Sequence, residues 1–171
     1  MIVCFSHGRD SGPGGFKIKN LTTLAKVRGW ETESVDYRGL DDPMVRVQKL
    51  LNILKEEQRR PLVLVGSSMG AFVSIVASRR IRPAGLFLMA PAVYLKGYEY
   101  PDITPFAGRI EVVHGRRDSL VPVENARRYA AEFNLPLHIL DSGHSLNDKM
   151  EEIKDIFSRF LENVIGHSSP K

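Results

Sequence analysis

Short apolar runs alternate with longer amphipathic stretches along this chain, and that alternation restricts its fold more than any other feature. Six runs have the composition of strands, and they cover residues 2–5, 31–37, 62–65, 86–89, 110–113 and 137–140. Helical spacing of apolar residues marks five stretches, which cover residues 16–28, 43–54, 69–80, 122–132 and 146–163. We therefore predict an α/β fold: a three-layer α/β/α sandwich around a mainly parallel, six-stranded sheet with right-handed crossovers.

Length and composition favour one folded domain. The chain has 171 residues, within the range of about 100–200 that one domain uses, so we expect residues 1–171 to form a single α/β domain. Hydrophobic residues make up 43% and charged residues 26%, which argues against a disordered chain. The net charge of +4 is too small to indicate a nucleic-acid partner. Because Cys4 is the only cysteine, the sequence excludes an internal disulfide and a cysteine-rich zinc site.

The distribution of apolar residues also bears on where the protein works. The longest mostly apolar stretch, residues 84–95, is shorter than the roughly 20 residues that a membrane-spanning helix needs. Near the N-terminus, Ser6, His7 and Gly8 interrupt the first apolar run, and no charged leader precedes that run. We therefore expect a cytoplasmic protein with no membrane partner.

The segment Gly-Ser-Ser-Met-Gly at residues 66–70 lies between an apolar strand and an apolar helix. It matches the pattern G-x-S-x-G, in which the central serine occupies a sharp turn from strand to helix. Glycines stand two residues to either side because larger side chains would collide at such a turn. Ser68 is therefore the candidate nucleophile, and its neighbour Ser67 is the alternative.

Two later loops supply the acid and the base that such a serine needs. Asp118 follows the predicted strand at 110–113, and His144 follows the one at 137–140. Both therefore lie beyond carboxyl ends of strands, where open parallel sheets bind ligands. The chain order of serine, acid and histidine is the order that goes with this motif. A histidine in this place accepts the proton of the serine, and a carboxylate holds the tautomer of the imidazole. Asp141, three residues before His144, is the rival acid.

The other histidines and acids fit structural roles better than catalytic ones. Glu111 and His138 lie inside predicted strands, and His167 lies in a polar tail. We expect His114 to pack and form hydrogen bonds within the Asp118 loop. None of these residues has the spacing of a metal-ligand set, so no metal or other cofactor is expected.

These residues together resemble the α/β-hydrolase superfamily, in particular its small, lidless bacterial esterases similar to dienelactone hydrolase. The matching segments run from residue 6 to about 146, and they are His7-Gly8, residues 66–70, Ala90-Pro-Ala-Val93, His114-Gly-x-x-Asp118 with Val121-Pro122, and Gly143-His144. The resemblance implies that the backbone N–H groups of Met69 and Arg9 form the oxyanion hole. Gly8 before Arg9 allows the backbone to approach the site closely.

The chain departs from the family pattern in two ways. It begins on the strand that is normally third, so we expect a minimal fold that lacks the first two strands. Only 20 residues, 90–109, separate the fourth and fifth long strands, which leaves no room for a cap domain. We therefore expect a shallow, open pocket that favours short acyl groups, with one low wall formed by Tyr94, Tyr98, Tyr100 and Phe106.

The resemblance implies a serine hydrolase that cleaves a carboxylic ester or thioester of a small acyl substrate through an acyl-enzyme intermediate. The alternative is a hydrolase-fold protein that only binds a ligand, with its triad idle. Residues alone leave peptidase and haloperoxidase-like activities open, and they do not give the oligomeric state. Four basic pairs are interpreted as solvated surface charge; of these, Arg116 and Arg117, together with Arg9, belong to the catalytic face and only weakly suggest anionic substrates.

Overall fold

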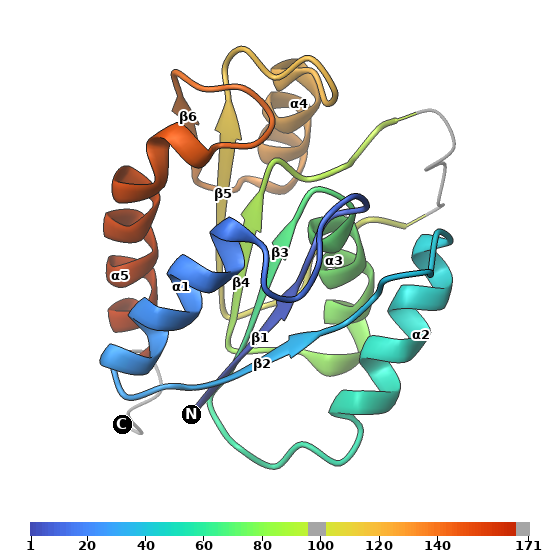
Figure 1. Cartoon of the computed structure of the whole chain (residues 1–171), viewed down its shortest axis with the longest axis vertical. Helices are drawn as coiled ribbons and strands as arrows, with labels where there is room; N and C mark the ends of the chain where they lie inside the picture. Colours follow the sequence, from blue (N-terminus) through green and yellow to red (C-terminus); the bar gives the residue numbers. More distant parts are fainter. Residues whose placement is uncertain (96–101, 167–171) are drawn as a thin grey trace.

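Six parallel strands form one continuous sheet in the computed structural model, which describes residues 1–95 and 102–166 (Figure 1). The strand order is β2-β1-β3-β4-β5-β6, and every neighbouring pair is parallel. The strands are β1 (Ile2–Ser6), β2 (Glu31–Val35), β3 (Leu62–Ser67), β4 (Gly85–Met89), β5 (Arg109–Gly115) and β6 (Leu137–Leu140). The helices are α1 (Phe16–Val27), α2 (Pro43–Leu54), α3 (Met69–Ile81), α4 (Val123–Phe133) and α5 (Met150–Gly166), the last preceded by the short 3₁₀ helix η1 (Asn147–Lys149).

Helices cover both faces of the sheet, which confirms the predicted three-layer α/β/α sandwich (Figure 1). α1 and α5 pack on one face, where the ring of Phe157 meets those of Phe5 and Phe87 edge-on, with centroids 6.5 and 5.0 Å apart. α2, α3 and α4 contribute Leu50, Val73 and Tyr129 to the core on the other face. These two buried clusters hold the sheet rigidly between the helical layers.

The sequence of the inner strands explains why both faces are buried. In β1, Val3 and Phe5 enter the core under α1 and α5, while Ile2 and Cys4 enter the core under α2 and α3. Successive side chains of a strand point to opposite faces, so a strand covered on both sides must be apolar throughout. In the edge strand β2, the first four residues alternate between exposed and half-buried, and only Val35 is buried.

Several predicted boundaries differ from the observed ones: β3 and β5 each extend two residues past the predicted ends at 65 and 113, and α5 ends at Gly166 rather than at residue 163. Two other differences have a local reason. The second strand ends at Val35 rather than at residue 37, because the N–H of Tyr37 donates to the ring of His7 and not to a neighbouring strand. The closing helix begins at Met150 rather than at residue 146, because Leu146 has a left-handed backbone (φ 58°) that an α-helix cannot include. Within residues 1–95 and 102–166, no helix is long and apolar enough to cross a membrane.

Candidate active site

Ser68 occupies the sharp turn between β3 and α3. Its backbone has φ 55° and ψ −120°, a conformation that a residue with a side chain adopts only under strain. The turn is held in place because the Ser68 N–H donates to the carbonyl of Met89, at 2.9 Å. The flanking glycines are required sterically: a Cβ at Gly66 would lie 2.4 Å from Cα of Ala71, and one at Gly70 would lie 2.0 Å from the carbonyl oxygen of Ser6.

A continuous chain of hydrogen bonds connects Ser68, His144 and Asp118. The Nε2 atom of His144 lies 3.0 Å from Oγ of Ser68, and its Nδ1 atom lies 2.7 Å from Oδ2 of Asp118. Asp118 follows β5 and His144 follows β6, so three loops at the carboxyl edge of the sheet bring these side chains together. The side chain of Asp118 is completely buried, whereas that of His144 is 20% exposed. This geometry fits a histidine that accepts the proton of Ser68 while a carboxylate holds its ring.

The surroundings of Asp118 keep it ionised and fixed. Its Oδ1 atom accepts two backbone hydrogen bonds at 2.9 Å, from Leu120 and Val121. The Nε2 atom of His114 faces two acceptors, Oδ2 of Asp118 at 3.2 Å and the carbonyl of Val121 at 2.9 Å, so it bears the proton. Burial by itself raises the pKa of Asp118, but the hydrogen bonds from His114, His144 and Val121 outweigh burial and hold that pKa below its usual value.

The rival acid, Asp141, lies elsewhere. Its carboxylate is exposed and pairs with Arg117, with Nε of the arginine 3.1 Å from Oδ1, while Arg116 lies 3.9 Å away. Of the two candidates, it is therefore Asp118 that contacts His144. Arg116 and Arg117, two of the three arginines that suggested an anionic substrate, are therefore paired with this surface carboxylate.

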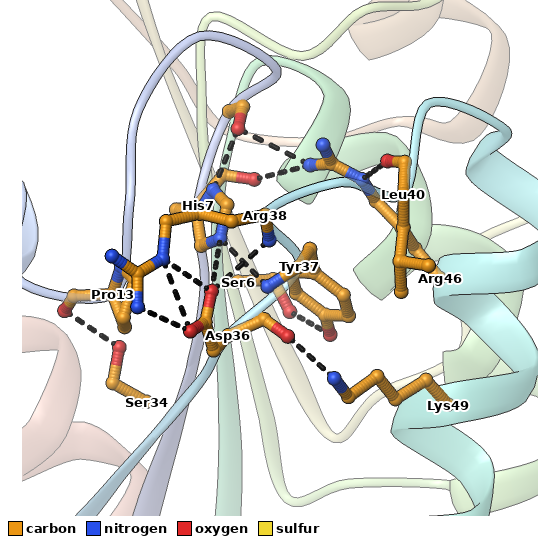
Figure 2. A network of polar contacts seen from close by, with 11 residues as sticks. Ser6, His7, Pro13, Ser34, Asp36, Tyr37, Arg38, Leu40, Arg46 and Lys49 are labelled. Carbon is orange, nitrogen blue, oxygen red and sulfur yellow. Dashed lines mark hydrogen bonds and ion pairs between the residues drawn. The ribbon is translucent and has the colours of Figure 1, made fainter.

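A buried polar network holds the loop that follows β1 (Figure 2). The Nε2 atom of His7 accepts from the N–H of Tyr37 at 2.9 Å, so Nδ1 bears the proton and donates to the Gly8 carbonyl at 2.7 Å. Burial lowers the pKa of His7 despite the opposing effect of its bond to Gly8, which fits a neutral ring. From the other side, Nη1 of Arg46 donates to the carbonyls of His7 and Gly8 at 3.3 and 3.2 Å.

This network sets the direction of the peptide between Gly8 and Arg9. In a trans peptide the C=O and N–H groups point in opposite directions. Because Arg46 and His7 hold the Gly8 carbonyl, the N–H of Arg9 points away from them. Gly8 itself packs on the serine turn, since a Cβ there would lie 3.5 Å from Cβ of Ser68. Met69, the other predicted donor, is the first residue of α3, so its N–H has no acceptor within that helix.

A cavity of about 300 Å³ opens above the serine. Its lining combines polar residues, apolar residues and two of the three candidate catalytic residues: Gly8, Arg9, Asp10, Ser11, Lys17, Ser67, Ser68, Ala92, Leu95, Leu120, Val121 and His144. Ser68 and His144 therefore share one open space with the residues of the loop that follows β1. A small organic ligand fits a space of this size.

No model of a known protein family matches the sequence, and no curated protein matches it either. Solved structures match throughout the fold. A candidate hydrolase of the α/β superfamily from Xanthomonas campestris pv. campestris superposes with a TM-score of 0.88 at 28% identity, over 95% of this chain and 98% of that one. The chain belongs to the α/β-hydrolase superfamily. An α/β serine hydrolase homologue from Coxiella burnetii (TM-score 0.78, 20% identity, 93% of this chain and 84% of that one) and the α/β hydrolase domain-containing protein 10 from mouse (0.77, 16%, 95% and 90%) share the fold.

In this α/β-hydrolase-superfamily chain, the strand order fits a minimal version of the fold, as predicted. The prediction of an aromatic wall was wrong for its two described members, Tyr94 and Phe106, because neither lines the cavity. Tyr94 has a left-handed backbone (φ 54°) and turns towards α4, where its hydroxyl lies 2.5 Å from the Glu132 carboxylate. Phe106 packs under the guanidinium of Arg82, with 5.0 Å from its Cζ to the ring centroid. Tyr98, Tyr100 and the predicted tail residue His167 lie outside the described residues.

The other predicted assignments can be placed as well. His138 pairs with Glu111 at 2.8 Å within the sheet, so neither residue belongs to the site. Among the described residues, no three His, Cys, Asp or Glu side chains gather as a metal site would require. Sequence reasoning missed Lys17 and Arg46, both of which contact loops of the site from helices. Neither residue has a motif around it, so no local signal could have marked it.

Proposed function

We propose that this protein is a serine hydrolase that cleaves a carboxylic ester or thioester of a small acyl substrate. The observation that carries the proposal is the hydrogen-bonded chain from Asp118 through His144 to Ser68, which opens into a cavity. Its structural neighbours include proteins described as hydrolases, which supports a hydrolytic role. Such a chain turns a weakly nucleophilic hydroxyl into a nucleophile at neutral pH.

In the acylation step, Oγ of Ser68 attacks the carbonyl carbon while Nε2 of His144 accepts its proton. The ionised carboxylate of Asp118 stabilises the imidazolium that forms. The N–H groups of Met69 and Arg9 stabilise the negative oxygen of the tetrahedral intermediate. When the intermediate collapses, the bond to the leaving oxygen or sulfur breaks, and His144 gives its proton to that atom. The alcohol or thiol departs, and the acyl group remains on Ser68.

Deacylation repeats these transfers with water. A water molecule gives a proton to His144 and attacks the acyl carbon. The bond to Oγ of Ser68 then breaks, and His144 returns the proton to that oxygen. The carboxylic acid leaves and the free enzyme is regenerated, so no external oxidant or cofactor enters the balance.

Labelling with a fluorophosphonate probe tests the proposal, because such probes form a covalent bond with an activated serine. We expect the wild-type protein to react and Ser68→Ala to lose both labelling and at least about 10⁴-fold of any ester hydrolysis. Ser67→Ala is the matched control, since Ser67 is adjacent and also lines the cavity; it should still react. A wild-type protein that never reacts with the probe would instead indicate a binding protein with an idle triad. Loss of labelling in Ser67→Ala alone would identify Ser67, and not Ser68, as the nucleophile.

A further inference from the structure

Lys17 brings a positive charge into the candidate active site from the first turn of α1. Its side chain is half-buried, and it lines the cavity that contains Ser68 and His144. Its Nζ atom donates to the carbonyl oxygen of Ser145, the residue after His144, at 2.6 Å. An ammonium group therefore lies beside the loop that presents the general base.

The same lysine also faces a smaller hollow that adjoins the cavity. This hollow has a volume of about 140 Å³ and shares Gly8, Ser11, Lys17 and Ser67 with the cavity. Ser145 and Asn147 complete its polar rim. A water molecule occupies about 30 Å³ in the liquid, so the hollow has room for a carboxylate group but not for a large substituent.

The electrostatics of Lys17 favour an anion in this place. Burial lowers the pKa of the ammonium, and the negative charge of Asp118 only partly opposes that effect. Within the described residues, the acceptor of its hydrogen bond is a neutral carbonyl and not a carboxylate. The ammonium has lost part of its hydration and has only a neutral acceptor. An anionic acceptor would stabilise it more, because hydrogen bonds between charged groups are stronger than those to neutral groups.

The other charged residues that line the cavity are less suited to bind an anion. Arg9 extends outward, with its Nε atom 3.8 Å from the Asp41 carboxylate and 60% of its side chain exposed. The acidic group on the lining, Asp10, belongs to an exposed residue at the rim. Of the charged lining residues, Lys17 alone is half-buried, so its charge is the least screened by solvent.

The lining of the cavity also includes four apolar residues, Ala92, Leu95, Leu120 and Val121. Ser68 shares the cavity with these apolar residues and with Lys17, so a substrate that combines an apolar group with a charged or polar one matches the lining.

We infer that the substrate of this site is a short ester or thioester that carries a carboxylate, and that Lys17 binds that carboxylate. The inference rests on the proposed function for the reaction itself, but the binding of the anion can be tested without turnover. It assigns to Lys17 the anionic preference that the sequence attributed to Arg9, Arg116 and Arg117, of which the last two pair with Asp141.

Two ligands of the same shape separate charge from size: monoethyl succinate ends in a carboxylate, and ethyl succinamate ends in a neutral amide. Calorimetry on Ser68→Ala, which cannot turn the ligands over, should show monoethyl succinate binding about tenfold or more tightly. Lys17→Met should remove that preference and leave the affinity for ethyl succinamate within about twofold. Lys17→Arg should keep it, because the charge remains. Lys19→Met, which removes an exposed lysine from the same helix, is the matched control and should change neither affinity.

The outcomes separate this inference from the proposed function. Equal binding of the two ligands to the Ser68→Ala protein overturns the inference whether or not the wild type hydrolyses esters. A preference for the anion without hydrolysis, and without labelling of Ser68, overturns the proposed function and leaves the anion site standing. If Lys17→Met lowers kcat/KM for both esters equally in the active enzyme, Lys17 only holds the Ser145 carbonyl beside His144, and the inference fails. Lys17→Gln, which keeps a donor without the charge, replaces Lys17→Met if the methionine variant does not fold.

Discussion

At the scale of single residues, Arg46 is a buried charge that holds backbone carbonyl groups next to the candidate active site. It is 1% exposed, and its guanidinium donates to the carbonyls of Leu40, His7 and Gly8 (Figure 2). Burying an arginine is costly unless its donors are used, and here two of the acceptors belong to the loop that carries the predicted oxyanion donor. Its planar fork fixes the carbonyls in a way that a single ammonium cannot.

We therefore predict that Arg46→Met lowers kcat about tenfold or more and leaves KM within about twofold, because it frees the peptide that presents the N–H of Arg9. Arg46→Lys should recover only part of that loss. Steady-state kinetics well below the melting temperature of each variant measure both constants. Lys49→Met is the matched control: Lys49 lies one turn further along α2 and donates to the carbonyl of Asp36, not to the Gly8 loop. If KM rises while kcat is kept, Arg46 affects binding and not the oxyanion hole.

The same scale shows what sequence can and cannot give. Ser68, Asp118 and His144 could be selected because each follows an apolar strand in a recognisable local pattern. The role of Lys17 depends on Ser145, 128 positions later, and that of Arg46 on Gly8, 38 positions earlier. No local pattern encodes such contacts, since they exist only once the sheet has assembled.

At the scale of elements, the contact between α3 and β1 sets how closely the serine turn approaches the Gly8 loop. A Cβ on Gly70 would lie 2.0 Å from the carbonyl oxygen and 2.4 Å from the carbonyl carbon of Ser6. Both are backbone atoms of a strand buried on both faces, so they cannot move aside as a flexible side chain would.

We predict that Gly70→Ala lowers the free energy of unfolding by about 3 kcal/mol, because α3 must be displaced from β1. Gly14→Ala is the control, since no atom lies within 4 Å of the added methyl group and its backbone has no positive φ; its effect should be within about 0.5 kcal/mol. Urea unfolding of both variants measures the difference. A midpoint for Gly70→Ala equal to that of the wild type would mean that α3 is free to shift, contrary to this packing.

Elements were predictable in number and type because burial on both faces forces inner strands to be apolar and helices to be amphipathic. The ends of the helices and strands were less predictable. β2 stops where Tyr37 turns its N–H to His7, and α5 starts only after the left-handed Leu146, whose side chain is fully buried. In both cases a tertiary contact overrides the local pattern.

At the scale of the whole molecule, the parallel sheet brings the loops that follow β1, β3, β4, β5 and β6 together around one cavity, and the length of each loop decides how deep the site can be. The connection between β4 and β5 covers residues 90–108, too few for a separate cap domain. The cavity above Ser68 measures about 300 Å³, and its apolar lining residues are Ala92, Leu95, Leu120 and Val121. Leu120 is 66% exposed, whereas Ala92 and Val121 are each 2% exposed, so the apolar lining meets solvent at Leu120.

This openness leads to a prediction about acyl chain length. Each buried methylene contributes about 0.8 kcal/mol, but only where there is wall to bury it against. We expect kcat/KM for neutral esters to rise from acetyl to about butyryl and then to level off or fall, because further carbons extend past Leu120 into water. Ethyl esters from acetyl to palmitoyl, assayed below their micelle concentrations with Ser68→Ala as the blank, measure the profile. A value of kcat/KM that continues to rise to the longest chains would reveal a deep acyl tunnel, and would require a covering element that the described residues do not provide.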